Sequence, residues 1–395
     1  MKYNHSFSQA NILLPKTNFE SWSVVACDQY TSEPEYWDTV KDFVGDNPSA
    51  LNIILPEVYL SDDNSSRIES INKNMQTYLD NEVFNEYPDS LIYVERIQSD
   101  GKLRRGIVGK IDLECYDYRS GTNAEIRATE QTVLSRIPPR VEIRKNAPLE
   151  MPHVMLLFDD EKDAIFSYLD ANKANFEKAY DFTLMCNAGS IKGYFLNDVA
   201  KQTVLSLLQN LKEQNNGFLF CVGDGNHSLA TAKECYNLNK TEASRYALTE
   251  IVNIHDKALE FEPIYRVVFG VDPEKLINDF VGTLGEGEQK FTCVYGETIK
   301  EIGVNATAKL AVGTLQSFLD EYIKNFPDAE IDYIHGEDSL KKLASCENAL
   351  GFIFDGMQKS ELFPAVNADG SLPRKTFSMG HADDKRFYIE ARKIK

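Results

Sequence analysis

The sequence lacks the features of exported, membrane-spanning and zinc-binding proteins. It has seven cysteines, an odd number, and no two of them form a Cys-x-x-Cys pair. It therefore predicts neither a disulfide framework nor a structural zinc site. No apolar run reaches the ~20 residues that a membrane-spanning helix needs, and Met1–Phe19 contains no charged-then-apolar signal pattern. We expect a reduced, cytoplasmic protein with no membrane partner.

Positive charge is also scarce. The chain has 42 Lys and Arg residues against 61 Asp and Glu residues, which gives a formal net charge of −19. A protein that binds duplex DNA usually needs a basic face to neutralise phosphates. The overall field of this chain would repel polyanions. The charge therefore favours a small-molecule partner over nucleic acid, and it leaves the oligomeric state open.

The composition is that of a globular protein: 43% of the 395 residues are hydrophobic and 26% are charged. Apolar residues recur at helical spacing in several segments and in short strand-like runs in others. This alternation predicts an α/β or α+β fold. The expected helices cover Pro34–Val44, Ser65–Leu79 and Asn197–Glu213. The expected strands include Ser90–Glu95 and Arg105–Leu113, joined by a turn at Gln98–Gly101.

One short segment combines glycines with residues suited to phosphate chemistry. An apolar run, Phe218–Val222, predicts a buried strand, and helix formers resume at Leu229. Gly223, Asp224, Gly225, Asn226, His227 and Ser228 lie between them. A helix start offers unpaired N–H groups and a positive dipole end, and glycine lets a phosphate approach the backbone. We interpret this loop as an anion- or phosphate-binding turn, although a purely structural turn capped by Ser228 is the alternative.

Two basic segments stand out from the acidic background. Ile126–Arg144 holds four arginines and is followed by Lys145. It is either a solvated basic face or a positive wall for an anionic ligand. Arg374 and Lys375 stand beside Thr376. That combination suits a phosphate or carboxylate clamp, and an exposed basic turn is the alternative.

Several motifs resemble a known family. Asp224–Ala232 resembles the Asp-Gly-His-His-Arg helix start of the bacterial family called domain of unknown function 1015. The resemblance covers nearly the whole chain. Four further segments carry it: Ala26–Tyr30, Ala128–Thr132, Phe261–Phe269 and Pro373–Phe377. The central motif is also similar to one in the ParB and sulfiredoxin superfamily, which includes free-serine kinases with a catalytic glutamate earlier in the chain.

This resemblance implies a domain organisation. A ParB-like strand–loop–helix core would occupy residues 121–275. An N-terminal α/β region would cover residues 1–120. A C-terminal α/β region, residues 276–395, would return to the cleft.

The resemblance also implies an activity: phosphoryl transfer from a nucleotide or pyrophosphate to free serine or a similar hydroxyl compound. Glu130 would be the general base, with Asp224 and His227 beside it, and Asp224 would hold Mg²⁺. The implied ligand-binding residues are Gly223, Gly225, Asn226, Ser228, Arg266, Arg374 and Lys375.

Two other functions stay open at this point. Asn226 and Ser228 replace a histidine and the arginine of the family motif. These replacements favour a catalytically silent nucleotide-binding regulator. A ParB-like nucleotide-dependent binding protein, working through a partner or DNA, is the second alternative, and the acidic charge argues against DNA.

Overall fold

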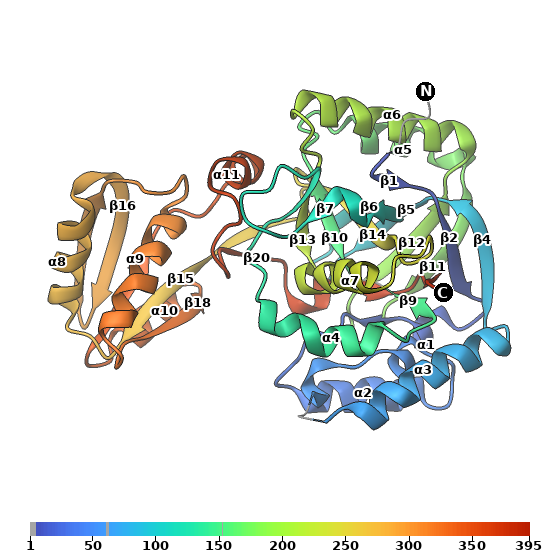
Figure 1. The fold of residues 1–395 in the computed structure, drawn as a ribbon, viewed down its shortest axis with the longest axis horizontal. Coiled ribbons are helices and arrows are strands. Elements are labelled where there is room, and N and C mark those ends of the chain that lie inside the picture. The colour runs from blue at the N-terminus through green and yellow to red at the C-terminus, as the bar shows by residue number, and fades with distance from the viewer. Residues whose placement is uncertain (1–4, 61–62, 152) are drawn as a thin grey trace. The chain divides into compact units, whose positions relative to one another are not determined.

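The computed structural model describes residues 5–60, 63–151 and 153–395 (Figure 1). It divides the chain into two compact units. Unit 1 takes the chain up to Ala128, then Thr132–Leu259 and His381–Lys395, and unit 2 takes Thr129–Gln131 and Glu260–Gly380. Both units combine sheets with helices, so the predicted α/β class is confirmed. The predicted three-region organisation and the ParB-like core stay predictions.

A large mixed sheet forms the centre of unit 1. Its strands follow the order β11-β12-β5-β6-β14-β10-β13-β8-β7, and β1 also pairs with β6. The pairs β10–β14, β13–β8 and β7–β8 are parallel, and the others are antiparallel. The predicted turn at residues 98–101 joins β5 to β6 in an antiparallel pair, as expected. The strands are β1 (Phe7–Ser8), β5 (Ile92–Ile97), β6 (Leu103–Asp112), β7 (Tyr116–Asp117), β8 (Ile126–Ala128), β10 (Met155–Phe158), β11 (Glu177–Thr183), β12 (Ser190–Phe195), β13 (Phe220–Asp224) and β14 (Tyr246–Asn253).

Side chains alternate between the two faces of this sheet, as strand geometry requires. Val94 and Val108 belong to one hydrophobic core, and their neighbours Tyr93 and Ile107 belong to another. The first core includes side chains of α1 (Phe19–Trp22), α2 (Pro34–Val44) and α3 (Ser65–Asp80). The second includes side chains of α5 (Ala164–Asn172), α6 (Asp198–Gln214) and α7 (Asn226–Leu238). The sheet is therefore covered on both faces.

The three helices predicted in unit 1 are confirmed as α2, α3 and α6, with ends that shift by at most one residue. Helix α4 (Ile137–Arg144) lies in the segment predicted to be basic. Three short two-stranded sheets complete the unit: β2 (Ala10–Pro15) with β4 (Phe84–Ser90), β3 (Val24–Val25) with β21 (Phe387–Tyr388), and β9 (Leu149–Glu150) with β22 (Arg392–Lys393). None of the helices in the described part of the chain is long and apolar enough to cross a membrane.

Gly225 forms the connection between β13 and α7. Its φ of 77° and ψ of 27° are left-handed, a conformation that favours glycine. A Cβ atom at this position would lie 3.0 Å from the Cα atom of Val154, so the close packing also disfavours a side chain. The predicted order of strand, turn and helix is confirmed, but the turn is shorter than the expected six-residue loop. Asp224 ends the strand, and Asn226 already begins the helix.

Unit 2 is built on a six-stranded sheet in the order β17-β16-β19-β15-β18, with β20 paired to β15. Its strands are β15 (Phe261–Phe269), β16 (Glu286–Tyr295), β17 (Thr298–Val304), β18 (Glu330–His335), β19 (Ala349–Ile353) and β20 (Phe377–Met379). Its helices are α8 (Pro273–Leu284), α9 (Ala311–Asn325), α10 (Glu337–Ala344) and α11 (Leu362–Asp369). Residues 129–131 join this unit because the backbones of Thr129 and Gln131 both bond to Leu372.

Buried ion pairs attach the segment His381–Lys395 to the rest of unit 1. The Arg386 guanidinium donates to Glu250 at 2.8 Å and to Glu390 at 2.6 Å. The Tyr180 hydroxyl donates to the other Glu390 oxygen at 2.5 Å. All four residues are buried, so these partners are needed to stabilise the ionised form of each carboxylate. The network fixes the backbone on either side of Arg386.

Candidate functional site

Asp224 brings a carboxylate to the end of β13. Its Oδ1 accepts the N–H of Gly225 at 2.9 Å, and its Oδ2 lies 3.4 Å from Nζ of Lys385. Both side chains are largely buried, at 16% and 15% exposure. Lys385 was missed in the sequence because it is 161 positions away along the chain and no motif surrounds it. A carboxylate and an ammonium group therefore lie close together at the start of α7.

His227 lies in the first turn of α7. Its Nε2 accepts the backbone N–H of Val133 at 3.2 Å, so the neutral ring carries its proton on Nδ1. Burial, together with the positive charges of Arg140 and Arg136, lowers the pKa of His227 to about 4. The imidazole is consequently neutral at physiological pH. It offers an Nδ1–H donor rather than a positive charge.

The other two polar residues of this turn bond within unit 1. The Asn226 amide donates to the Thr132 hydroxyl at 3.0 Å, and the Ser228 hydroxyl lies 3.4 Å from Nε2 of His153. His153 also contacts the Asp28 carboxylate at 3.7 Å. Burial raises the pKa of Asp28, but the nearby His153 and its other partners outweigh that effect and leave the pKa below its ordinary value.

His153 and Asp28 were not among the predicted site residues. Asp28 lies in the segment Ala26–Tyr30 that resembles the family, and this was the available signal. His153 carried none, because its role depends on side chains distant in sequence.

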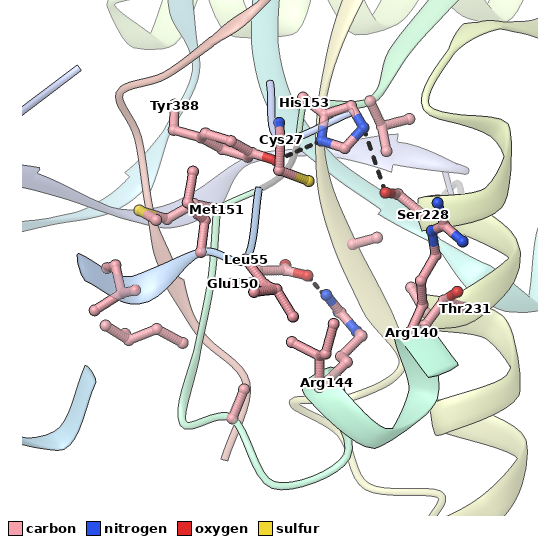
Figure 2. A pocket seen from close by; sticks show the side chains of 18 of the residues that line it. Cys27, Leu55, Arg140, Arg144, Glu150, Met151, His153, Ser228, Thr231 and Tyr388 are labelled. Atoms are coloured by element: carbon pink, nitrogen blue, oxygen red, sulfur yellow. Dashed lines mark hydrogen bonds and ion pairs between the residues drawn. The ribbon is translucent and has the colours of Figure 1, made fainter. Parts of the chain in front are cut away.

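A cavity of about 170 Å³ lies beside the first two turns of α7 (Figure 2). Most of its wall is aliphatic, with contributions from Leu55, Ile143, Leu149, Leu229 and Ala232. Figure 2 shows Cys27, His153 and Tyr388 together at one end and the Arg144–Glu150 ion pair at the other. The cavity therefore combines an apolar body with polar ends.

The basic segment around α4 is partly neutralised by carboxylates. Arg140 pairs with Glu57, and Arg144 pairs with Glu150. Arg127 donates to the carbonyl of Ala124 at 2.8 Å and lies over the Phe218 ring. The segment is therefore mixed: two of its arginines are paired with carboxylates, Arg127 is held by a carbonyl and a ring, and Arg136 is exposed.

In unit 2, Glu130 holds the turn that contains the predicted basic clamp. Its Oε1 accepts the backbone N–H of Thr376 at 3.2 Å. The Thr376 hydroxyl donates back to the carbonyl of Pro373 at 2.7 Å. Lys375 has a left-handed φ of 54°, so this turn is tightly constrained. The family segments around Glu130 and Arg374 thus lie in contact.

Arg266 is fully buried on β15. Its guanidinium donates to Gln316 at 2.8 Å and to the carbonyls of Lys375 at 3.0 Å and Arg374 at 3.2 Å. It also bonds the carbonyl of Ile264. Burial lowers its pKa to about 10, which still leaves it charged at neutral pH. Arg266 positions the backbone of the clamp, and its direct contact with a phosphate stays a prediction.

The side chains of Arg374 and Lys375 are exposed and gather around Tyr333. Arg374 donates to the Tyr333 hydroxyl at 3.1 Å. The cationic groups of Arg266, Arg374 and Lys375 lie 4.7, 5.2 and 5.3 Å from the centre of the Tyr333 ring. This aromatic face offsets part of their mutual repulsion.

The predicted site residues therefore form two groups. Unit 1 contains Gly223, Asp224, Gly225, Asn226, His227 and Ser228, and unit 2 contains Glu130, Arg266, Arg374 and Lys375. The convergence of the two groups in one cleft stays a prediction. Within residues 5–60, 63–151 and 153–395, no group of three or more His, Cys, Asp or Glu side chains is placed to hold a metal ion.

Comparison with solved structures finds distant similarity. A free serine kinase variant in complex with ADP shares 12% identity at a TM-score of 0.42, over 74% of this chain and 93% of that one. A free serine kinase in complex with AMP shares 13% identity at a TM-score of 0.41, over 72% and 90%. A conserved hypothetical protein from Pyrococcus furiosus shares 14% at a TM-score of 0.38, over 72% and 94%.

No curated protein matches the sequence. A family model, in contrast, matches residues 9–391, which is almost the whole chain and includes both groups of candidate residues. The chain belongs to the family described as protein of unknown function (DUF1015).

Proposed function

We propose that this protein is a small-molecule phosphotransferase that moves a phosphoryl group from a nucleotide or pyrophosphate to free serine or a related hydroxyl compound. The observation that carries the proposal is the connection from β13 through Gly225 to α7. It presents a carboxylate and a neutral histidine at the start of a 13-residue helix, and Lys385 of the C-terminal segment lies against that carboxylate. These groups are suited to a phosphate and its counter-charges.

The donor phosphates would lie against the first turn of α7. Backbone N–H groups in the first turn of a helix have no carbonyl partner within that helix, and the dipole there favours negative charge. Gly225 at the N-cap has no side chain to shield them. The Nδ1–H of His227 and the ammonium of Lys385 would add donors. A neutral histidine fits this role because its Nδ1–H can donate to a phosphate oxygen without the ring taking up a second proton.

Asp224 is the residue that would hold Mg²⁺. Mg²⁺ is usually held by one or two carboxylates together with substrate phosphates, so a single aspartate at a phosphate site fits this ion. Bound Mg²⁺ would supply neutralisation of the phosphate charge. Lys385, 3.4 Å from Asp224, provides a positive charge in the same place from the chain itself. It would balance Asp224 before the donor binds.

Glu130 would take the proton from the acceptor hydroxyl. This role comes from the resemblance, and the hydrogen bond to Thr376 supports it because that bond fixes one carboxylate oxygen. Arg374 and Lys375 would stabilise negative charge on the phosphates as exposed cations held by a rigid turn. Arg266 would keep that turn in place.

A catalytically silent nucleotide-binding regulator is the second candidate. It is favoured by the bonds of Asn226 to Thr132 and of Ser228 to His153, which direct two motif positions to neighbours within unit 1. A protein of this kind would bind the donor in the same way and transfer nothing.

The test is a thermal-shift series on the full chain with ATP, ADP and pyrophosphate, each with and without Mg²⁺. Phosphoserine formation from free serine is followed in parallel by ³¹P NMR. A ligand that binds only the folded protein raises Tm. We expect an Mg²⁺-dependent rise with the donor, and turnover with serine or another hydroxyl compound. Donor binding without transfer to any acceptor would favour the regulator. The absence of any shift would contradict both.

A further inference from the structure

The cavity beside α7 is distinct from the phosphate site. It shares only Ser228 with the predicted site residues, and it extends away from the helix start along Leu229, Thr231 and Ala232. Other parts of the wall come from α4, from the segment Ile53–Leu55 and from β9. Apart from Ser228, none of the residues proposed to act on a phosphate or on an acceptor hydroxyl lines it.

The volume of the cavity limits what it can hold. An enclosed apolar cavity of roughly 150 Å³ is large enough to bind benzene. At about 170 Å³, this cavity fits one six-membered ring with one or two substituents, or a branched aliphatic chain of similar size. Free serine and a phosphate are both too small and too polar to fill it. Most small-molecule sites have such a mainly apolar wall with a few convergent polar groups.

The charges in the wall are balanced. Glu57 pairs with Arg140, and the buried Glu150 pairs with Arg144 and with Arg392 at 2.6 Å. Burial raises the pKa of the Cys27 thiol to about 12, so this side chain is also uncharged. The two arginines of the wall, Arg140 and Arg144, are each paired with a carboxylate, so an anionic ligand would have to compete for them. The wall therefore favours a neutral ligand.

One end of the cavity can recognise a polar group. The Tyr388 hydroxyl accepts the N–H of Cys27 at 3.3 Å and lies 2.7 Å from Nδ1 of His153. A hydroxyl can make one donated and two accepted bonds, and the third position of Tyr388 is taken by the Cys27 thiol, a weak hydrogen-bonding group that a ligand hydroxyl or amide can replace. Ser228 makes only a long contact with His153 at 3.4 Å, and its hydroxyl can turn towards a ligand. His153 and Tyr388 are buried, which strengthens any hydrogen bond formed there.

We propose that this cavity is a binding site for a small neutral molecule. The ligand would have one aromatic ring or branched aliphatic body against the aliphatic wall, and one hydroxyl or amide group directed at Tyr388 and Ser228. This site does not rest on the proposed phosphoryl transfer. Its test reads binding alone, so either idea can fail without the other.

The probes are 4-fluorophenol and fluorobenzene, titrated into the full chain and followed by ¹⁹F NMR. We expect saturable binding of both, with 4-fluorophenol at least several-fold tighter because only it offers a hydroxyl. Tyr388→Phe keeps the ring and removes the polar partner. It should therefore reduce the preference for 4-fluorophenol about tenfold, the effect of one buried hydrogen bond, and leave fluorobenzene binding unchanged.

Ala232→Leu fills the cavity from α7 and should abolish binding of both probes. Asn237→Leu introduces the same side chain at an exposed position on the same helix and should leave binding intact. Ala147→Val narrows the cavity from a loop. It serves as the second filling variant if the helix variant does not fold. Failure of the wild-type chain to bind either probe saturably, or equal binding by a folded filled variant, would overturn the proposal.

Discussion

The two groups of candidate residues surround different kinds of backbone structure. In unit 1, Asp224 and His227 lie at the start of a helix, where we propose that a phosphate binds. In unit 2, the guanidinium of Arg266 is fully buried and bonds to backbone carbonyls of its own unit. Glu130 likewise accepts a backbone N–H. One group is arranged around a helix terminus, and the other is arranged around a turn of the chain.

This difference shows that charge type alone does not identify a ligand-binding residue. Arg266 and Arg374 both look like phosphate ligands in the sequence. Only Arg374 is exposed, and Arg266 is one of the residues that hold its backbone. Replacing a cation that only positions another cation should lower the free energy of unfolding more than it weakens ligand binding. The predictions below separate the two roles, beginning with the largest expected effect.

Glu130 provides the strongest test of whether unit 2 takes part in chemistry. Glu130→Gln keeps the shape and can still accept the N–H of Thr376, but it removes the base. Turnover should fall by roughly a hundred- to ten-thousand-fold, with little change in donor affinity. Steady-state kinetics and donor titration measure the two effects. Glu262→Gln, at an exposed position on β15, is the matched control. Full turnover in Glu130→Gln would show that the base lies elsewhere.

Arg266 tests whether the buried cation is structural. Arg266→Met leaves its carbonyl and amide acceptors without a donor in the interior. It should lower the free energy of unfolding by about 3 kcal/mol or more. Chemical denaturation measures this loss. Arg374→Met, at an exposed position, should cost less than about 0.5 kcal/mol and weaken donor binding instead. Equal stability losses in the two variants would show that Arg266 and Arg374 do not differ in structural role.

Asp224 and Lys385 test the group in unit 1. Asp224→Asn should weaken the Mg²⁺-dependent part of donor binding roughly tenfold, the value of one charged interaction. Lys385→Met should weaken donor binding by a similar factor whether or not Mg²⁺ is present. Calorimetric titration with and without the ion distinguishes them. Asp198→Asn, at a highly exposed position, is the control. Identical Mg²⁺ dependence in Asp224→Asn and the wild type would argue against a metal-binding role for Asp224.

His227 gives the smallest effect, and it depends on pH. Its pKa falls from 6.5 to about 4 on folding, so the unfolded chain binds the proton more readily between these values. Stability should therefore be complete above pH 6.5 and decline as the pH falls towards 4. The loss should be about 1–2 kcal/mol once solvent screening is allowed for. His227→Gln should flatten this part of the stability curve. A variant with an unchanged acid limb would contradict the lowered pKa.

Local patterns predicted the helices and the central connection well. The boundaries of α2 and the order of β13, Gly225 and α7 depend on spacing within short segments, which the sequence shows directly. The turn was predicted too long because Asn226, His227 and Ser228 are weak helix formers, and the sequence does not show that the helix already includes them. Tertiary packing determines that boundary.

Long-range contacts were beyond the reach of those patterns. Nothing near Lys385 indicates a partner at Asp224. The buried role of Arg266 depends on Gln316 and on the turn at residues 374–375. Charge matching around α4 depends on Glu57 and Glu150, which belong to other elements. The resemblance to a family pointed to Glu130 and to the C-terminal segment as site residues. It did not distinguish residues that would contact a ligand from residues that hold the backbone in place.

The divided course of unit 1 along the chain has a consequence for its folding during synthesis. Residues up to Leu259 leave the ribosome first, and all of Glu260–Gly380 must follow before His381–Lys395 can add to them. Until then, Glu250 lacks its partner Arg386, and the place of β21 beside β3 is empty. Unit 2 is continuous apart from three residues and has no such delay. We therefore expect nascent chains to expose an incomplete first unit beside a nearly complete second one, which makes that stage the most exposed to aggregation and to chaperone binding.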